Sequence, residues 1–239
     1  MKIALITGIS KGLGEGLAKI LLERNYRVTG LGRNDNPNLN GGHYRFVSLD
    51  LKKPDKIKTI KPLLQEMANE QPESILLISN AGVHGACGAI GELDEDKVLE
   101  TFNVNLLSPV LLSNVFTDVF APLSLHKRIL NVSSAAANSP IPGGSTYCQT
   151  KAGVEILTRV MFEEQKNKPY PIEVIAIRPG RLDTPMQAEL RHLPNLPMGP
   201  ILRKAYEDGA LKDPLLTARE IVEKFVDSPI ESGTTYTLE

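Results

Sequence analysis

The sequence of 239 residues has few of the features that mark several large protein classes. It contains two cysteines, Cys87 and Cys148, so neither a disulfide framework nor a zinc site is expected. Lysine and arginine number 27 against 28 aspartates and glutamates, which gives a formal net charge of -1. Because there is no basic excess, we do not expect nucleic acid as a partner.

Long apolar runs are also missing. No stretch approaches the ~18 apolar residues of a membrane span, so no membrane partner is expected. The apolar run at the N-terminus is short, and a glycine-rich stretch follows it rather than a cleavage pattern. These features, with an apolar content of 41%, predict a cytoplasmic protein whose residues 1–239 form a single domain.

The chain does contain a nucleotide-binding pattern near its start. A short apolar run, 3–7, leads into a glycine-rich turn, after which apolar residues recur at helical spacing. Strand, glycine loop and helix form the first unit of a dinucleotide-binding fold, whose glycines let the backbone approach a pyrophosphate. The residues predicted to bind the cofactor here are Gly8, Ser10, Lys11, Gly12, Leu13 and Gly14. An ordinary glycine turn is the structural alternative.

Apolar runs and helical periodicity continue to the end of the chain. They predict further strands at 27–31, 44–49, 75–78, 129–132, 172–177 and 234–238, and helices at 54–70, 94–120, 147–165 and 217–227. This alternation predicts an α/β fold: a Rossmann-type, doubly wound parallel sheet of about seven strands with helices on both faces. Prolines mark 186–200 as irregular apart from a short helix at 186–191, and 186–212 is predicted to form a substrate lid.

The end of the second predicted strand bears on the choice between NAD and NADP. An acid at this position commonly binds the ribose 2′-hydroxyl of NAD, but Gly32 and Arg33 stand there instead. Arg33, with Lys11 in the glycine loop, suits the 2′-phosphate of NADP. Asp35 is the alternative, as an acid for the 2′-hydroxyl of NAD. The structural alternative treats the two cations as solvated surface charges.

Polar residues also follow other predicted strands. Asp50 and Leu51 come after the third strand, where a carboxylate would meet an adenine amino group. The fourth strand runs into Ser79-Asn80-Ala81-Gly82. Within 94–120, Asn103 and Asn105 interrupt an apolar pattern. A buried amide needs hydrogen-bond partners, so one of these two has a role, either functional or structural.

Ser134, Tyr147 and Lys151 are the candidate catalytic residues. Tyr147 and Lys151 are four apart and would share one face of a helix. An ammonium beside a phenol is expected to lower the pKa of the phenol, which would then transfer protons near neutral pH. Ser134 follows the strand at 129–132 and would hydrogen-bond the same substrate oxygen. A solvated lysine and a capping serine are the structural alternative.

Taken in order, these motifs resemble the short-chain dehydrogenases/reductases, and the match runs from Thr7 to about Thr234. The cofactor loop of the family is similar to Thr7-Gly8-x-x-x-Gly12-x-Gly14, and its Asn-Ala-Gly element to Asn80, Ala81 and Gly82. The catalytic tetrad of the family falls at Asn105, Ser134, Tyr147 and Lys151. Its segment that holds the nicotinamide carboxamide is similar to Pro179, Gly180, Leu182 and Thr184.

Within the family, two stretches resemble the sepiapterin reductase and benzil reductase group: Tyr147–Gly153 and Pro179–Gln187. The resemblance implies a carbonyl reductase that uses NADP(H) to convert a ketone or α-dicarbonyl to an alcohol. Tyr147 would donate the proton, Ser134 would hold the substrate oxygen, Lys151 would bind the ribose and Asn105 would anchor a water. The family also implies a homodimer or homotetramer packed through 98–120 and 147–165.

Other functions are compatible with parts of the pattern. Arg181 replaces a small apolar residue beside the nicotinamide, which leaves the substrate class open. A sensor or scaffold would bind NADP without turnover, and an alcohol dehydrogenase would use the same residues. Sugar-nucleotide epimerases share Tyr-x-x-x-Lys but usually have a different glycine loop and a longer substrate domain, whereas about fifty residues follow Thr184 here.

Overall fold

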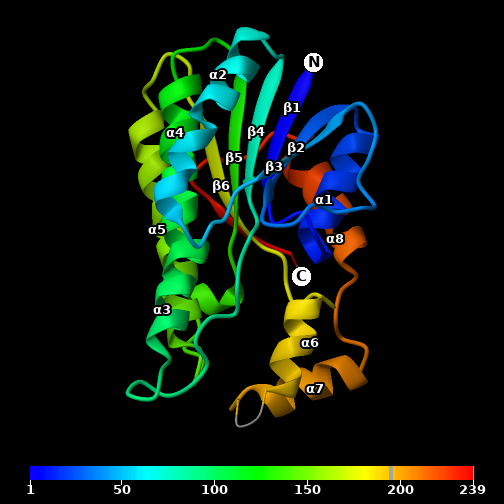
Figure 1. Cartoon of the computed structure of the whole chain (residues 1–239), viewed down its shortest axis with the longest axis vertical. Coiled ribbons are helices and arrows are strands. Elements are labelled where there is room, and N and C mark those ends of the chain that lie inside the picture. The colour runs from blue at the N-terminus through cyan, green and yellow to red at the C-terminus, as the bar shows by residue number, and fades with distance from the viewer. Residues whose placement is uncertain (194–195, 239) are drawn as a thin grey trace.

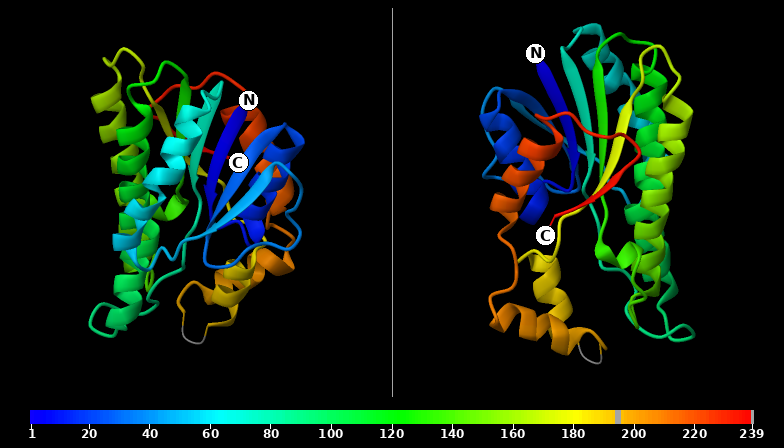
Figure 2. Two further views of the ribbon diagram at one scale, coloured as in Figure 1. Left: turned by 45° about the horizontal axis from the view of Figure 1, so that its top comes forward. Right: turned by 180° about the vertical axis from the view of Figure 1, so that it is seen from behind.

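A computed structural model describes residues 1–193 and 196–238, and these form a seven-stranded sheet (Figures 1 and 2). Every neighbouring pair of strands is parallel, and the order is β3-β2-β1-β4-β5-β6-β7. The strands are β1 Lys2–Thr7, β2 Tyr26–Gly32, β3 Tyr44–Ser48, β4 Ser74–Ser79, β5 His126–Val132, β6 Glu173–Arg178 and β7 Thr235–Thr237. The predicted Rossmann-type, doubly wound fold is confirmed.

Helices cover both faces of the sheet, which explains why its central strands are apolar on both sides. β4 is buried at all six positions. One face packs against α1 (Gly12–Glu23) and α8 (Pro214–Phe225), and the other against α2 (Lys61–Asn69), α4 (Ser108–Phe120) and α5 (Ser145–Gln165) (Figure 1). A separate hydrophobic core fills each side, so the sheet is a rigid platform for the residues at its edge.

Prolines divide two helices that the sequence predicts as continuous. The stretch 54–70 is a 3₁₀ segment, η1 (Pro54–Ile60), followed by α2, with Pro62 in the first turn of α2. The stretch 94–120 becomes α3 (Glu95–Phe102), a π-helical segment η2 (Asn103–Leu107) and then α4, with Pro109 in its first turn. Proline lacks an N–H, so it is accommodated where a helix begins. Among the residues described, no helix has the length and apolarity to cross a bilayer.

The predicted lid contains more regular structure than expected. It comprises α6 (Pro185–His192) and α7 (Gly199–Glu207), which lie beyond the carboxyl ends of the strands (Figures 1 and 2). α6 corresponds to the helix predicted at 186–191, whereas α7 was not predicted because proline-rich sequence usually signals a loop. Pro200 stands in the first turn of α7, where proline is tolerated. Residues 194–195, which fall in the predicted irregular stretch, lie outside the described residues.

Candidate active site

A cavity of about 630 Å³ opens at the carboxyl ends of the strands. The sheet order reverses between β1 and β4, and such a switch point is where parallel sheets bind ligands. The lid contributes Gln187, Leu190 and Leu202 to the wall. All the predicted cofactor-binding residues line this cavity: Gly8, Ser10, Lys11, Gly12, Leu13, Gly14, Arg33, Asp50, Leu51, Asn80, Ala81, Gly82, Tyr147, Lys151, Pro179, Gly180, Leu182 and Thr184.

The glycine loop forms a cradle that admits backbone but not side chains. Gly8 has a φ of 73°, and a Cβ on Gly14 would lie 2.1 Å from the carbonyl oxygen of Gly8. The Asn80 amide ties the loop to the end of β4, because its Nδ2 donates to the Thr7 and Gly8 oxygens at 3.0 and 3.2 Å. The N-terminus of α1 follows at once, and its first N–H groups are free to bind an anion. The loop therefore fits the pyrophosphate of a dinucleotide.

The region beyond β2 contains Arg33 and Asp35, the cation and the carboxylate that the sequence offers for the 2′ position of the cofactor ribose. Gly32, Arg33 and Asn34 line the cavity, whereas Asp35 is not among its described lining residues. The Asp35 carboxylate accepts hydrogen bonds from the Tyr44 hydroxyl at 2.5 Å and from the Asn36 N–H at 2.7 Å. Burial, and then this bond to Asp35, raise the pKa of Tyr44, so the hydroxyl stays a donor. Asp35 is therefore engaged away from the cavity.

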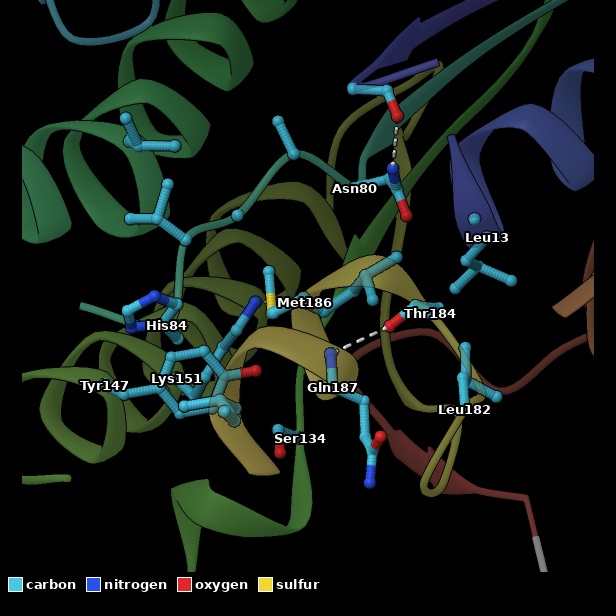
Figure 3. Close-up of a pocket in the computed structure, with 18 of the residues that line it drawn as sticks. Leu13, Asn80, His84, Ser134, Tyr147, Lys151, Leu182, Thr184, Met186 and Gln187 are labelled. Carbon is cyan, nitrogen blue, oxygen red and sulfur yellow. Dashed lines mark hydrogen bonds between the residues drawn. The ribbon is translucent and has the colours of Figure 1, made fainter. Parts of the chain in front are cut away.

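Ser134, Tyr147 and Lys151 come together on the cavity wall (Figure 3). Ser134 caps a short 3₁₀ turn, η3 (Ala135–Ala137), where its Oγ accepts from the Ala136 N–H at 3.2 Å. Lys151 is 4% exposed, and its Nζ donates to the carbonyl oxygen of Val132 at 2.7 Å. The same Nζ lies 5.7 Å from the centre of the Tyr147 ring. A hydroxyl, a phenol and an ammonium thus share one wall.

The pKa of Tyr147 differs from the expectation. Burial raises it, and a side-chain hydrogen bond with Ser134 offsets part of that rise. The sequence-based prediction that Lys151 lowers the pKa of Tyr147 is wrong for this structure, because burial dominates and the ammonium turns toward the Val132 carbonyl. Burial also lowers the pKa of Lys151 to about 8. Tyr147 therefore holds its proton at neutral pH, whereas the pKa of Lys151, about 8, lies close to neutral pH.

Asn105 lies behind the cavity rather than in its wall. It belongs to η2, where its Oδ1 accepts from the Val83 N–H at 2.8 Å and its Nδ2 donates to the Val83 oxygen at 2.8 Å. It fastens the segment after Gly82 to the helical layer, and its water-anchoring role stays a prediction. The Asn103 amide donates to the Lys52 oxygen at 3.1 Å. Both amides therefore have structural hydrogen bonds.

Several lining residues were not predicted individually. His84 and Cys87 follow β4, with the Nδ1 of His84 3.5 Å from the thiol of Cys87. The lid adds Met186, Gln187 and Leu190. The sequence gives no motif for any of these, although 135–146 and 186–212 were expected to line a pocket. Among the described residues, no group of three or more His, Cys, Asp or Glu side chains is arranged to hold a metal ion.

Burial of Lys151 predicts a pH dependence of stability. Its pKa is about 8 in the folded chain against a reference of 10.5, so at neutral pH folding is penalised for burying the charge. The penalty disappears as the pH rises from about 8 to about 10.5, which corresponds to about 3 kcal/mol. We expect the free energy of unfolding of the unmodified protein to rise by this amount relative to Lys151→Met between neutral and alkaline pH. Urea unfolding of both proteins measures it, and a constant difference would contradict it.

Comparison with known proteins places this geometry in a family. The family model described as short chain dehydrogenase matches residues 2–195. The benzil reductase ((S)-benzoin forming) of Bacillus cereus is 34% identical over 198 residues, covering 80% of each chain. The benzil reductase ((S)-benzoin forming) of Bacillus subtilis is 32% identical over 240 residues, covering 99% of this chain and 98% of that protein. The predicted resemblance to the benzil reductase group is confirmed.

Solved structures agree in fold. A short chain dehydrogenase/reductase from Saccharomyces cerevisiae superposes with a TM-score of 0.83 at 21% identity. The superposition covers 99% of this chain and 96% of the yeast chain, so the lid helices and the sheet both fall within the shared fold.

Proposed function

The chain belongs to the short chain dehydrogenases, a family of oxidoreductases that use a nicotinamide cofactor, and we propose that it is an NADPH-dependent carbonyl reductase. Its substrate would be a ketone or α-dicarbonyl, which it reduces to an alcohol. The observation that carries the proposal is that one cavity is lined by the glycine loop together with Ser134, Tyr147 and Lys151. The names of the two Bacillus relatives support a dicarbonyl substrate.

The residues of the cavity suit a reduction. When bound, the cofactor supplies the hydride. The cradle at Gly8 and Gly14 would hold its pyrophosphate, Lys151 its ribose hydroxyls, and the segment 179–184 its carboxamide. Tyr147 would donate a proton to the substrate oxygen, and Ser134 would donate a hydrogen bond to the same atom.

The local hydrogen bonds support these two roles. The Ser134 oxygen accepts from the Ala136 N–H, and the Ser134 side chain also hydrogen-bonds Tyr147, so the serine and the phenol meet where the substrate oxygen would lie. Burial keeps Tyr147 protonated at neutral pH, and the proton donor of a reduction must start in that state.

Arg33 and Lys11 are proposed to select NADPH over NADH by contacting its 2′-phosphate. A charge-assisted contact contributes about 1.5–3 kcal/mol, or roughly 10- to 150-fold in binding. Arg33→Ala should therefore raise the KM for NADPH by a factor in that range and leave the KM for NADH almost unchanged. High salt should weaken NADPH binding more than NADH binding, because the contact is partly exposed.

Arg45→Ala is the matched control, since Arg45 is an exposed arginine on β3 that pairs with Glu66 at 3.6 Å. It should change neither KM. The kcat/KM of the unmodified protein for the two cofactors decides between the phosphate contact and a 2′-hydroxyl contact from Asp35. A preference for NADH would refute the phosphate contact.

The proposed activity is tested by following NADPH consumption with benzil, an aliphatic α-diketone and a simple ketone. Turnover with a dicarbonyl supports the proposal. NADPH binding without turnover of any carbonyl would instead support a sensor or scaffold. Turnover only with alcohols and NADP⁺ would indicate an alcohol dehydrogenase.

We also propose a homodimer or homotetramer packed through 98–120 and 147–165. Leu107, at the end of η2, is 39% exposed, and on α5 Ile156 and Val160 are 52% and 48% exposed. An apolar helical surface of this kind suits contact with a second copy of the chain.

A further inference from the structure

Glu155 is a buried carboxylate that the proposed reaction does not use. It stands one helical turn after Lys151, so Tyr147, Lys151 and Glu155 follow one another along one face of α5. Its residue surface is 7% exposed. Burying a carboxylate is unfavourable unless the charge is paired and hydrogen-bonded, so the partners of Glu155 indicate its role.

Three hydrogen bonds satisfy this carboxylate. Arg178 forms a two-pronged pair with it: Nε donates to Oε1 at 2.8 Å and Nη2 to Oε2 at 2.7 Å. The Ser133 hydroxyl donates to Oε1 at 2.7 Å. The side-chain hydrogen bond with Glu155 raises the pKa of Arg178, so the guanidinium stays charged. Bidentate pairs of this kind fix orientation as well as distance.

The three bonds join the segments that carry the site. Ser133 precedes Ser134 at the end of β5, and Arg178 is the last residue of β6, directly before Pro179 and Gly180. Glu155 itself belongs to the helix that carries Tyr147 and Lys151. The Glu155 carboxylate therefore connects three parts of the proposed site. These are Ser134, which would bind the substrate oxygen, the helix α5, and the segment 179–184, which would bind the carboxamide.

Lys151 stands one helical turn before Glu155, but its own hydrogen bond goes elsewhere. Lys151 donates to Val132, the neighbour of Ser133, and within the described residues no carboxylate lies within ion-pair distance of it. Glu155 forms its ion pair with Arg178, so it does not neutralise the ammonium of Lys151. The other titratable groups that face the same cavity are Lys11, Arg33, Asp50, Lys52, His84, Cys87, Glu100, Tyr147, Arg178 and Arg181.

We propose that Glu155 and Arg178 are positioning residues that neutralise each other and so reserve the charge of Lys151 for a bound nicotinamide nucleotide. The inference rests on the proposed function, because it takes Lys151 to bind the ribose of that nucleotide. Removing Glu155 leaves the Arg178 cation unpaired and disfavours the protonated form of Lys151. Removing Arg178 leaves the Glu155 carboxylate unpaired one helical turn from Lys151 and favours the protonated form of Lys151.

The two single variants therefore have opposite electrostatic effects. We expect NADPH affinity, measured by the fluorescence of the bound nucleotide, to fall as the pH rises through the pKa of Lys151. The midpoint of this fall should move down by about one pH unit in Glu155→Gln and up by about one pH unit in Arg178→Gln. It should return to that of the unmodified protein in the double variant. A purely structural role would weaken binding in both variants without opposite shifts.

Two controls lie close by. Glu164→Gln removes an exposed carboxylate from the same helix, and Ser133→Ala removes a neutral hydrogen bond from Glu155. Both should leave the midpoint unchanged. Midpoints that move in the same direction in the two single variants, or in neither, would overturn the proposal. Where one single variant fails to fold, the other still decides: its midpoint must move by about one pH unit in the direction given above, and an unmoved midpoint overturns the proposal.

Because the measurement follows binding rather than turnover, its outcome is independent of the proposed reaction. A protein that shows the opposite shifts but reduces no carbonyl would refute the proposed function and leave this inference in place. A protein that reduces dicarbonyls without the opposite shifts would support the proposed function and refute this inference.

Discussion

Tyr147→Phe is expected to lower kcat by a factor of about 10² to 10⁴, the usual contribution of general acid catalysis. The substitution keeps the ring and removes the proton that the substrate oxygen would receive. The hydroxyl faces the cavity that also contains the glycine loop, and burial holds it in the protonated form. Steady-state reduction of a dicarbonyl, at saturating NADPH, measures the loss.

The dissociation constant for NADPH should be nearly unchanged in this variant, because the ring remains in place. Tyr170→Phe is the matched control, because the Tyr170 residue is 46% exposed. Its kcat and its dissociation constant for NADPH should equal those of the unmodified protein. Near-normal turnover of purified Tyr147→Phe would remove Tyr147 from the proposed mechanism, whatever its fold.

Lys151→Met is expected to weaken NADPH binding and turnover together. The methionine has a similar length but neither charge nor hydrogen-bond donors, so it cannot bind ribose hydroxyls. Loss of a hydrogen bond from a charged donor corresponds to roughly 10- to 150-fold in the dissociation constant. Turnover should fall as well, since the ribose fixes the position of the reacting ring. Fluorescence titration and steady-state kinetics separate the two effects.

Lys127→Met provides a second buried lysine for comparison. Lys127 is 1% exposed, and its Nζ donates to the Leu123 oxygen at 2.6 Å, outside the described lining of the cavity. That variant should lose stability but keep its affinity for NADPH. If Lys151→Met loses turnover while its NADPH affinity is intact, the ribose contact is wrong and the lysine acts on the substrate side alone.

Much of the fold follows from patterns that repeat within one element. Apolar strands flanked by amphipathic helices specify a covered parallel sheet, and the glycine loop after β1 specifies where the pyrophosphate fits. The predicted cofactor-binding residues outside α5 line one cavity because they follow strands, and parallel strands end at a common edge. Lys11, Arg33 and Asp50 reach one cavity for that reason.

Other features depend on contacts between elements, which spacing does not reveal. The stretch 94–120 has helical periodicity throughout, and its π-helical segment coincides with the Asn105 amide that binds the backbone of Val83. The Lys151 ammonium was expected beside the Tyr147 oxygen. It donates instead to the Val132 carbonyl, whose position is set by β5. The direction of the Lys151 side chain could therefore not be predicted from the helix alone. No sequence motif marks Glu155, because its partner Arg178 is on β6.

The order of the strands has a consequence for how the chain folds. β1 pairs with β4, where Lys2 stands opposite Ser74, and β6 pairs with β7, where Ala176 stands opposite Thr235. Each pairing closes a long loop, and the loss of chain entropy precedes the stabilising contacts between the strands. Contact order is therefore high, and folding is expected to be slow. Because the cradle after β1 meets α5 only once β1 has paired with β4 and β4 with β5, a nucleotide would bind only a chain whose central sheet has formed. Ligand binding would therefore draw late folding intermediates toward the native state by mass action.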